Sequence, residues 1–355
     1  MERRPLVART TSAGGRKGGP VTLALVAQRA GVSTQTVSNA LNSPELLAPG
    51  TLKRVREALD ELDYRPHQAA RSLRTRSSRL IGYGVQPTPP GLSTPVTDHF
   101  LHALSDSADR AGYRILLFAA PLGTADEAER YDELLREHSV DGFVLSNTYR
   151  GDKRPGWLHK NGVPFIAFGR WSARDTGDWV DVDGAHGTAA AVDHLVAAGH
   201  RKIAFLGWPR GSGVGDDRAG GWREAMRQHD LPVRDLRVSS LDDVDAAREA
   251  VARVVGRATA VVAASDTLAL GCYRALRDAG LSPGRDVAVV GFDDSPAAGL
   301  LSPSLSSVRQ PLDEVGRACT RILMARIKDP AADPGRVLLA PELIVRESSS
   351  AEHRP

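Results

Sequence analysis

The sequence from Leu80 onwards alternates short, continuously apolar runs with longer stretches that have helical periodicity. The runs LIGYGV (80–85), KIAFLG (202–207) and DVAVVGF (286–292) lack the polar–apolar alternation of a half-exposed strand. Strands that are apolar on both faces fit parallel sheets covered by helices on both sides. Because residues 80–355 exceed what one hydrophobic core comfortably holds, the pattern predicts a body of two similar α/β lobes.

The expected elements divide between the two lobes. The first lobe would take about 80–180 and 310–330, and the second about 185–308 and 337–350. In such sheets small ligands bind in the crevice beyond the carboxyl ends of the strands. We expect strands at 80–85, 114–119, 141–146, 164–169, 202–207, 260–265, 286–292 and 337–340, and helices at about 98–111, 126–138, 184–198, 217–229, 243–256, 267–279 and 312–328.

Residues 21–64 have the pattern of three short helices. Thr22 can cap the first helix, Gly31 can end it, and Ser33 can cap the second. A helix, a glycine turn and a second capped helix form a helix-turn-helix, whose second helix enters the major groove of DNA. The third helix would span about 49–62. We therefore expect a small all-α DNA-binding head.

The second helix of this head would bury Val37 and expose four polar side chains. These are Thr34, Gln35, Ser38 and Asn39. Gln and Asn can pair bidentately with adenine, and each good pair contributes roughly 1–3 kcal/mol of discrimination. Periodicity alone leaves open a helical hairpin that belongs to a larger bundle.

Charge is unevenly distributed along the chain. Residues 1–79 contain 14 Lys and Arg against 6 Asp and Glu, although the net charge of the whole chain is only +3. A basic head on a mildly acidic body suggests a polyanionic partner for the head alone. Residues 1–20 are predicted to be a disordered basic tail. The basic linker 65–79 has almost no apolar face, so we expect it to fold only against something else.

Composition excludes several other classes of protein. Two cysteines, Cys272 and Cys319, cannot form a disulfide scaffold or a four-cysteine zinc site, and they fit a reducing cytoplasm. No apolar run approaches the ~18 residues of a membrane span. The arginine-rich N-terminus lacks the apolar core of a signal peptide. We therefore expect a cytoplasmic protein without a membrane partner.

Specific strings then identify a family. The string VA-x-x-AGVS-x-x-TVS-x-x-LN in residues 26–42 closely resembles the start of bacterial regulators of the lactose-repressor (LacI/GalR) family. The resemblance continues through FGR (168–170), HLVAAGHRKIAFLG (194–207), SDTLALG (265–271) and VVGFDD (289–294). It implies a helix-turn-helix head, a two-lobed body like that of periplasmic sugar-binding proteins, and a homodimer that binds a palindromic double-stranded DNA operator.

The resemblance also gives the linker a role. In such regulators it folds into a hinge helix on the operator, and a leucine wedges into the minor groove at the central base step. The matching wedge here is Leu73, with Ala70 small enough for close approach, and the bent duplex offsets the unstacking cost. The implied DNA-binding residues are Thr22, Ser33, Thr34, Gln35, Thr36, Ser38, Asn39, Asn42, Ala70 and Leu73.

The resemblance further implies an effector site in the body. Arg218, in RAGGW, matches the family arginine that grips the effector, and Asp293, in GFDD, matches an acidic ligand residue at a strand end. Ser265 stands where many sugar-responsive members have asparagine, and Arg170 would reach the crevice. Phe100 is a candidate stacking wall. Planar hydrogen-bonding groups with apolar walls suit a sugar.

Simpler explanations remain open for these residues. Arg218 could be an arginine on a helix surface, and Asp293 could cap a turn. Phe100 and the alternative walls Trp171 and Trp222 could be core aromatics.

Other chemistry is not indicated. His194 and His200 are six residues apart and have no third ligand nearby, so we expect no metal site. Nucleophile-elbow, Walker and H-E-x-x-H motifs are absent, so we expect no enzymatic activity and no cofactor. The run GSGVG (211–215) is interpreted as a loop over the crevice.

The combined prediction is a repressor that a small-molecule effector, a mono- or oligosaccharide, releases from its operator. The alternative is a regulator that needs a corepressor, a purine-like molecule or a phosphoprotein, in order to bind DNA. Both alternatives use the same head and the same crevice.

Overall fold

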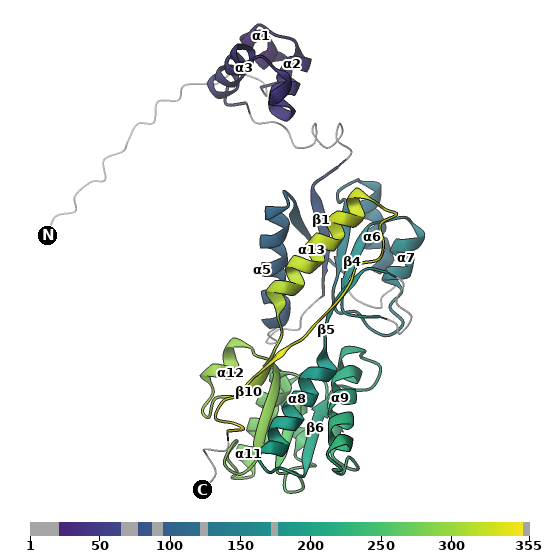
Figure 1. Ribbon diagram of the computed structural model, residues 1–355, viewed down its shortest axis with the longest axis vertical. Helices are drawn as coiled ribbons and strands as arrows, with labels where there is room; N and C mark the ends of the chain where they lie inside the picture. The colour runs from purple at the N-terminus through teal and green to yellow at the C-terminus, as the bar shows by residue number, and fades with distance from the viewer. Residues whose placement is uncertain (1–20, 65–76, 87–94, 121–126, 172–176, 351–355) are drawn as a thin grey trace, which may run out of the picture. The chain divides into compact units, whose positions relative to one another are not determined.

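The computed structural model describes residues 21–64, 77–86, 95–120, 127–171 and 177–350 (Figure 1). The chain divides into two compact units, Met1–Arg76 and Ser77–Pro355. We describe each unit separately, as the head and the body. The expected tail (1–20) and most of the expected hinge (65–76) lie outside the described residues.

The head contains α1 (Leu23–Ala30), α2 (Thr34–Asn42), the short 3-10 helix η1 (Pro44–Leu46) and α3 (Pro49–Glu61). The expected helix ends are confirmed: the Thr22 and Ser33 side chains accept hydrogen bonds from the backbone N–H groups of Leu25 and Thr36. Gly31 ends α1 with a left-handed φ of 64°. Val26, Val37 and Val55, one from each α-helix, are fully buried and form the centre of the small core, with Ala27, Ala30 and Ala58 around them.

The first lobe of the body has a six-stranded sheet in the order β11-β5-β4-β3-β1-β2, and every neighbouring pair is parallel. Helices α5 and α13 pack on one face, while α6 and α7 contribute to the core on the other. The strands are β1 (Leu80–Val85), β2 (Arg114–Ala119), β3 (Gly142–Leu145), β4 (Phe165–Phe168), β5 (Trp179–Val182) and β11 (Arg336–Leu339), and the helices are α5 (Pro95–Arg110), α6 (Glu127–Arg136), α7 (Arg154–Lys160) and α13 (Leu312–Lys328).

The second lobe repeats this arrangement with the order β12-β10-β9-β8-β6-β7. Only the pair β10–β12 is antiparallel. The strands are β6 (Ile203–Gly207), β7 (Arg237–Ser239), β8 (Ala260–Ala263), β9 (Ala288–Asp293), β10 (Ser306–Arg309) and β12 (Glu342–Ile344), and the helices are α8 (Gly184–Ala197), α9 (Val214–Gln228), α10 (Val244–Val251), α11 (Asp266–Asp278) and α12 (Pro296–Leu300).

The expected fold class is confirmed, and each of the eight expected strands overlaps an observed one. Sequence reasoning missed the short strands β5, β7, β10 and β12, and the helices α7 and α12. One lobe assignment was wrong. The segment 337–350 was placed wholly in the second lobe, but Arg336–Leu339 pairs with β5 in the first sheet. Only the residues after it join the second sheet.

Three segments connect the two lobes. The chain passes from β5 into α8 through Asp183, from β10 into α13 through Gln310 and Pro311, and from β11 into β12 through Ala340 and Pro341. The carboxyl ends of the parallel strands face the connecting region. Side chains that follow these strands are therefore brought to one place.

Candidate functional site

A crevice of about 1000 Å³ lies between the two lobes of the body. Its lining comes from the carboxyl ends of strands and the helices that follow them, as the parallel sheets predict. Three of the five expected effector residues line it: Phe100, Arg218 and Asp293. The other two, Ser265 and Arg170, lie beside it and are bonded to other residues.

Arg218 lies in the first turns of α9 with its side chain 5% exposed. Its Nη1 donates a hydrogen bond to the Ala264 carbonyl and lies 3.5 Å from Oδ1 of Asp293. The guanidinium also lies over the Phe292 ring, 3.6 Å from its centroid. Its Nε has no hydrogen-bond partner among the residues that the structure describes. The alternative of an exposed helix arginine was therefore wrong.

Asp293 is the last residue of β9, and its φ of 109° turns the chain sharply into the crevice. Its Oδ1 accepts a hydrogen bond of 2.7 Å from Nε2 of Gln310. Burial raises the pKa of this carboxyl to about 7, while Arg218 acts in the opposite direction. Asp293 and Arg218 thus form a buried pair that lines the crevice.

Ser265 and Asp266 act together at the start of α11. Ser265 caps the helix by accepting a hydrogen bond from the Leu268 N–H, and its hydroxyl donates to Oδ1 of Asp242 at 2.6 Å. Asp266 accepts hydrogen bonds of 2.6 Å from the Ser307 hydroxyl and the Ser295 N–H. Burial raises the pKa of Asp266 to about 6. Ser265 thus positions Asp242, which does line the crevice.

The first lobe contributes a mainly apolar wall. Phe100, on α5, is 1% exposed, and its ring centroid lies 4.7 Å from that of Phe168 at the end of β4. Tyr83, on β1, exchanges a 2.8 Å hydrogen bond with the Ser146 hydroxyl. Phe100 is therefore both a lining residue and a core residue, so both interpretations of it apply.

Arg170 forms a clasp, an ion pair between the two lobes beside the crevice. It follows β4 in the first lobe, and its Nε donates a 2.7 Å hydrogen bond to Oδ2 of Asp181. Its Nη2 is paired with Oδ2 of Asp217, on α9 of the second lobe. Because Asp217 immediately precedes Arg218, this exposed clasp is adjacent in sequence to the buried arginine.

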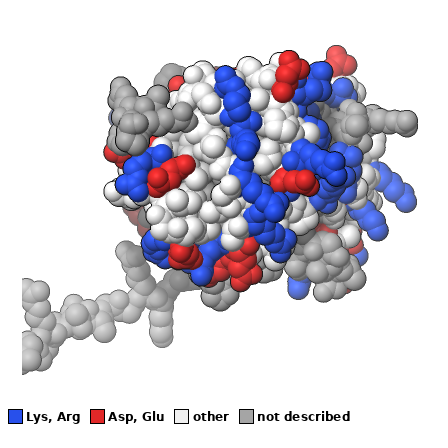
Figure 2. All heavy atoms as spheres, turned by 90° about the horizontal axis from the view of Figure 1, so that it is seen from below, with Lys and Arg blue, Asp and Glu red and all other residues white. Residues whose placement is uncertain are grey.

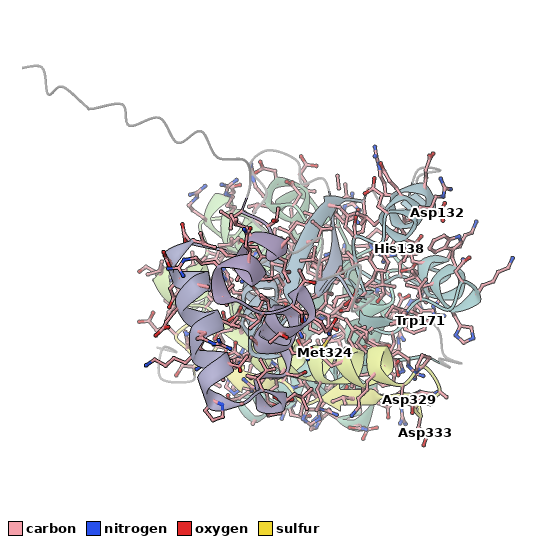
Figure 3. All side chains as sticks on the ribbon, turned by 90° about the horizontal axis from the view of Figure 1, so that it is seen from above. Asp132, His138, Trp171, Met324, Asp329 and Asp333 are labelled. Atoms are coloured by element: carbon pink, nitrogen blue, oxygen red, sulfur yellow. The ribbon has the colours of Figure 1, made fainter. Side chains whose placement is uncertain are left out.

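The aromatic wall of the second lobe was missed by sequence reasoning. Trp222 is 1% exposed and stacks on Phe205, so it is a core residue. Trp171, labelled in Figure 3, packs against Phe165 in the first lobe, with the ring centroids 6.2 Å apart. Trp208 lines the crevice instead. Its position directly after β6, three residues before the expected crevice loop (211–215), is the signal that could have found it.

His194 and His200 form structural hydrogen bonds. Nε2 of His194 lies 2.9 Å from the Ser349 hydroxyl, and Nδ1 of His200 lies 2.9 Å from that of Thr259. Among the residues that the structure describes, no group of His, Cys, Asp and Glu side chains is arranged to hold a metal ion. Within the same residues, no helix is long and apolar enough to span a bilayer.

In the head, α2 presents a polar face. Thr34 and Gln35 are exposed, and Nε2 of Gln35 donates a 3.0 Å hydrogen bond to Oδ1 of Asn39. The Ser33 hydroxyl lies 2.9 Å from that of Thr36, so both belong to the helix cap. Ser38 was expected to be exposed, and this was wrong: it is only 8% exposed.

The remaining expected DNA contacts have less structural description. Thr22 is exposed at the start of α1, where it serves as the cap. Asn42 is the last residue of α2, and its side chain is outside the described part of the chain. Ala70 and Leu73 lie outside the described residues altogether.

One face of the body carries charged side chains of both signs. Figure 2 views the molecule from below, where basic and acidic side chains are interspersed on the second lobe. Ion pairs on the second lobe include Arg248–Asp278 and Arg285–Asp286.

Comparisons with known proteins agree with the two-part organisation. Residues 22–67 match the family of bacterial regulatory proteins called the lacI family, and residues 192–349 match a periplasmic binding protein-like domain. The chain is 34% identical to the HTH-type transcriptional regulator CelR of Thermobifida fusca, over 92% of this chain and 98% of that protein.

Two solved structures are similar along most of the chain. A complex of transcriptional regulator CelR with cellobiose has 31% identity and a TM-score of 0.71, covering 92% of this chain and 99% of that one. The lac repressor dimer bound to operator and the anti-inducer ONPF has 26% identity and a TM-score of 0.81, covering 93% and 99%.

Proposed function

Because the chain belongs to the lacI family of bacterial regulatory proteins, which are DNA-binding transcriptional regulators and not enzymes, we propose that it is a sugar-responsive repressor. It binds a palindromic operator as a homodimer, and a mono- or oligosaccharide in the crevice releases it. A repressor of this kind acts on the chromosome, which places it in the cytoplasm.

The polar face of α2 supports direct base contact. Thr34, Gln35 and Asn39 lie on a helix that is capped by Ser33 and Thr36 and packed on α1, so the helix is already formed before DNA arrives. A helix that is already formed avoids the entropy cost of ordering a flexible segment on DNA. On an operator, the Gln35 and Asn39 amides exchange their mutual hydrogen bond for base edges. Thr22, Ser38 and Asn42 are proposed as supporting contacts.

The single observation that carries the effector proposal is the pair Arg218–Asp293 at the base of a crevice with aromatic walls. A buried guanidinium and a buried carboxyl supply donors and acceptors in fixed directions, and a sugar hydroxyl is both a donor and an acceptor. Phe100 and Phe168 supply the apolar surface that sugar C–H groups need. Ser265 acts through Asp242, and Arg170 acts through the clasp.

Coupling between the crevice and the DNA head passes through residues 65–79, which directly precede β1. We propose that effector binding shifts the lobes, separates the two hinges of a dimer and unfolds them, withdrawing Leu73 and Ala70 from the minor groove. A coupling free energy of about 1–3 kcal/mol is enough for a useful switch. A linker without a core of its own suits an order–disorder step.

A gel shift with the full chain and DNA from the region upstream of its own gene tests the proposal. We expect a specific complex that weakens steeply as salt rises, because bound phosphates release counterions. We also expect one neutral sugar of a panel to dissociate it. Leu73→Ala should reduce specific binding much more than nonspecific binding. If the complex forms only when a purine is added, the corepressor alternative replaces this proposal.

A further inference from the structure

Trp208 lies in the wall of the crevice, where its ring can contact an effector. It follows β6 directly, packs on the core of the second lobe and lines the crevice. We propose that Trp208 is the stacking platform of the effector site, and that the carboxylates around it restrict the effector to an uncharged sugar ring. This inference rests on the proposed function and specifies the ligand of the same crevice.

The local chain is shaped around this indole. A Cβ atom added at Gly215 would lie 2.7 Å from Cε3 of Trp208, so only glycine leaves room for the ring at this position. Gly211 and Gly213 of the same loop have φ angles of 98° and 70°, which favour glycine. The run GSGVG, which forms the loop before α9 and the first two residues of that helix, therefore packs against Trp208 at Gly215 and contributes Ser212 and Val214 to the crevice lining.

The platform is adjacent to the effector arginine. The Arg218 guanidinium carbon lies 5.4 Å from the Trp208 ring centroid, within range of a cation–π contact. Among the described residues, Nε1 of Trp208 and Nε of Arg218 are both buried donors without a hydrogen-bond partner. Across the crevice, the buried hydroxyl of Thr148 also has no partner within that part of the chain. Buried polar atoms without partners are costly, and a sugar with hydroxyls at its edge can satisfy them.

The charge of the lining determines which sugars fit. Among the described residues, six carboxyl groups and a single guanidinium line the crevice: Asp98, Asp181, Asp242, Asp266, Asp293 and Asp294, with Arg218. Asp181, Asp293 and Asp294 are paired with arginines. The other three have no ion-pair partner in the described part of the chain. The guanidinium that an anionic ligand would need is already engaged by Asp293.

An anionic ligand therefore meets uncompensated like charges in a partly desolvated site, where repulsion is stronger than in water. A neutral ring instead places its C–H face on the indole and its hydroxyls on the carboxylates and Arg218. Phosphorylated sugars, uronic acids and nucleotides are disfavoured by the same residues that bind hydroxyls. Trp208 and these carboxylates thus act together to select a neutral sugar over an anionic one.

The test is isothermal titration calorimetry on the full chain, with cellobiose, maltose and glucose as neutral probes and glucuronate and glucose 6-phosphate as charged ones. We expect at least one neutral probe to bind, and we expect glucose to bind at least ~10-fold more tightly than its charged counterparts. Trp208→Leu should weaken the tightest neutral probe by roughly 10- to 100-fold, and Trp208→Phe by less.

Trp157→Leu, the same change on the outer helix α7, is the matched control and should leave affinity unchanged. The double variant Asp98→Asn, Asp242→Asn should improve glucuronate binding at least ~10-fold relative to glucose. Thermal unfolding of each variant identifies any that fails to fold. If Trp208→Leu fails to fold, the affinity of the milder variant Trp208→Phe tests the platform in its place.

The possible failures can be told apart. If wild-type protein binds no sugar, the proposed function fails and this inference fails with it. If a neutral sugar binds but Trp208→Leu binds it equally well, the platform is wrong while the function stands. If glucose 6-phosphate binds as tightly as glucose, the charge restriction is wrong.

Discussion

The two lobes of the body have the same strand order and different chemistry at the crevice. Strands β1 to β5 with β11 correspond in order to β6 to β10 with β12. At equivalent places the lobes present different side chains: β4 ends at Phe168, whereas β9 ends at Asp293. The loop after β3 carries Ser146 and Thr148, whereas β8 is followed by Ser265 and Asp266.

This difference indicates a division of roles. The first lobe supplies an apolar wall with a few hydroxyls and two of the carboxyls, Asp98 and Asp181, whereas the second supplies Arg218, Trp208 and the other four carboxyls. A shared scaffold fixes where strand ends meet, while the residues at those ends decide what is bound. Changes in the first lobe should therefore affect mainly the fold, and changes in the second mainly the ligand.

The largest expected effect is on stability, in the first lobe. Phe100→Ala should cost about 3–5 kcal/mol of unfolding free energy, because it removes a buried aromatic ring from the α5–α13 core. Chemical denaturation followed by circular dichroism measures it. The affinity of the folded fraction for a neutral sugar should change less. A large loss of affinity with unchanged stability would contradict the division of roles.

Arg218→Ala should produce the reverse result in the second lobe. We expect effector affinity to fall by at least ~30-fold, since charge-assisted hydrogen bonds are lost, while operator affinity stays the same. Calorimetry and gel shifts measure the two affinities. Arg223→Ala, an exposed arginine one turn further along α9, is the control. Induction that survives in Arg218→Ala would show that the effector binds elsewhere.

The buried carboxyls of the second lobe should make its stability depend on pH. The pKa of Asp293 is raised to about 7 and that of Asp266 to about 6, above the values in an unfolded chain. A raised carboxyl pKa stabilises the fold at low pH, and this stabilisation is lost as pH rises through the folded pKa.

We therefore expect Tm to fall between about pH 4 and 7, from the pKa of an unfolded carboxyl to the raised folded values, by roughly 2–4 °C for each kcal/mol lost. Asp293→Asn, which cannot ionise, should flatten the fall when Tm is measured by calorimetry across that range. Phe100→Leu, in the first lobe, is the control. The Tm of this variant should fall with pH as steeply as that of the wild type. An unchanged slope in Asp293→Asn would mean that this carboxyl is ionised throughout.

The clasp between the lobes should have the smallest effect. Asp217→Asn removes a half-exposed ion pair with Arg170, which is worth about 0.2–1 kcal/mol at such a surface. We expect effector affinity to fall by only about 2- to 5-fold, with a weaker effect at high salt. Calorimetry at two salt concentrations measures it. A loss as large as that of Arg218→Ala would make Asp217 a ligand contact.

Sequence patterns predicted the head and the parallel strands because each is a local signal. The caps at Thr22 and Ser33 and the apolar runs of the central strands depend on neighbours in the chain. The edge strand β7 and the terminal strands β11 and β12 are short or partly exposed, so their apolar signal is weak. The sheet that each of these strands joins depends on contacts with residues that are distant in the sequence. Sequence reasoning therefore assigned Arg336–Leu339 to the wrong lobe.

The site shows the same limit. A family motif located Arg218 and Asp293, and the structure brings them together. The motif could not show whether Ser265 contacts the ligand directly or supports Asp242, because that depends on the direction of its hydroxyl. Choosing among Trp171, Trp208 and Trp222 required the three-dimensional neighbours of each ring.

The shared C-terminal segment has a consequence for synthesis. Strand β11 closes the first sheet and β12 closes the second, only three residues apart in the chain at Leu339 and Glu342. While the ribosome is still making residue 330, both sheets lack their outermost strand. Neither half can therefore mature independently during translation, and losing the last twenty described residues to a nonsense codon or a protease should unravel both halves at once.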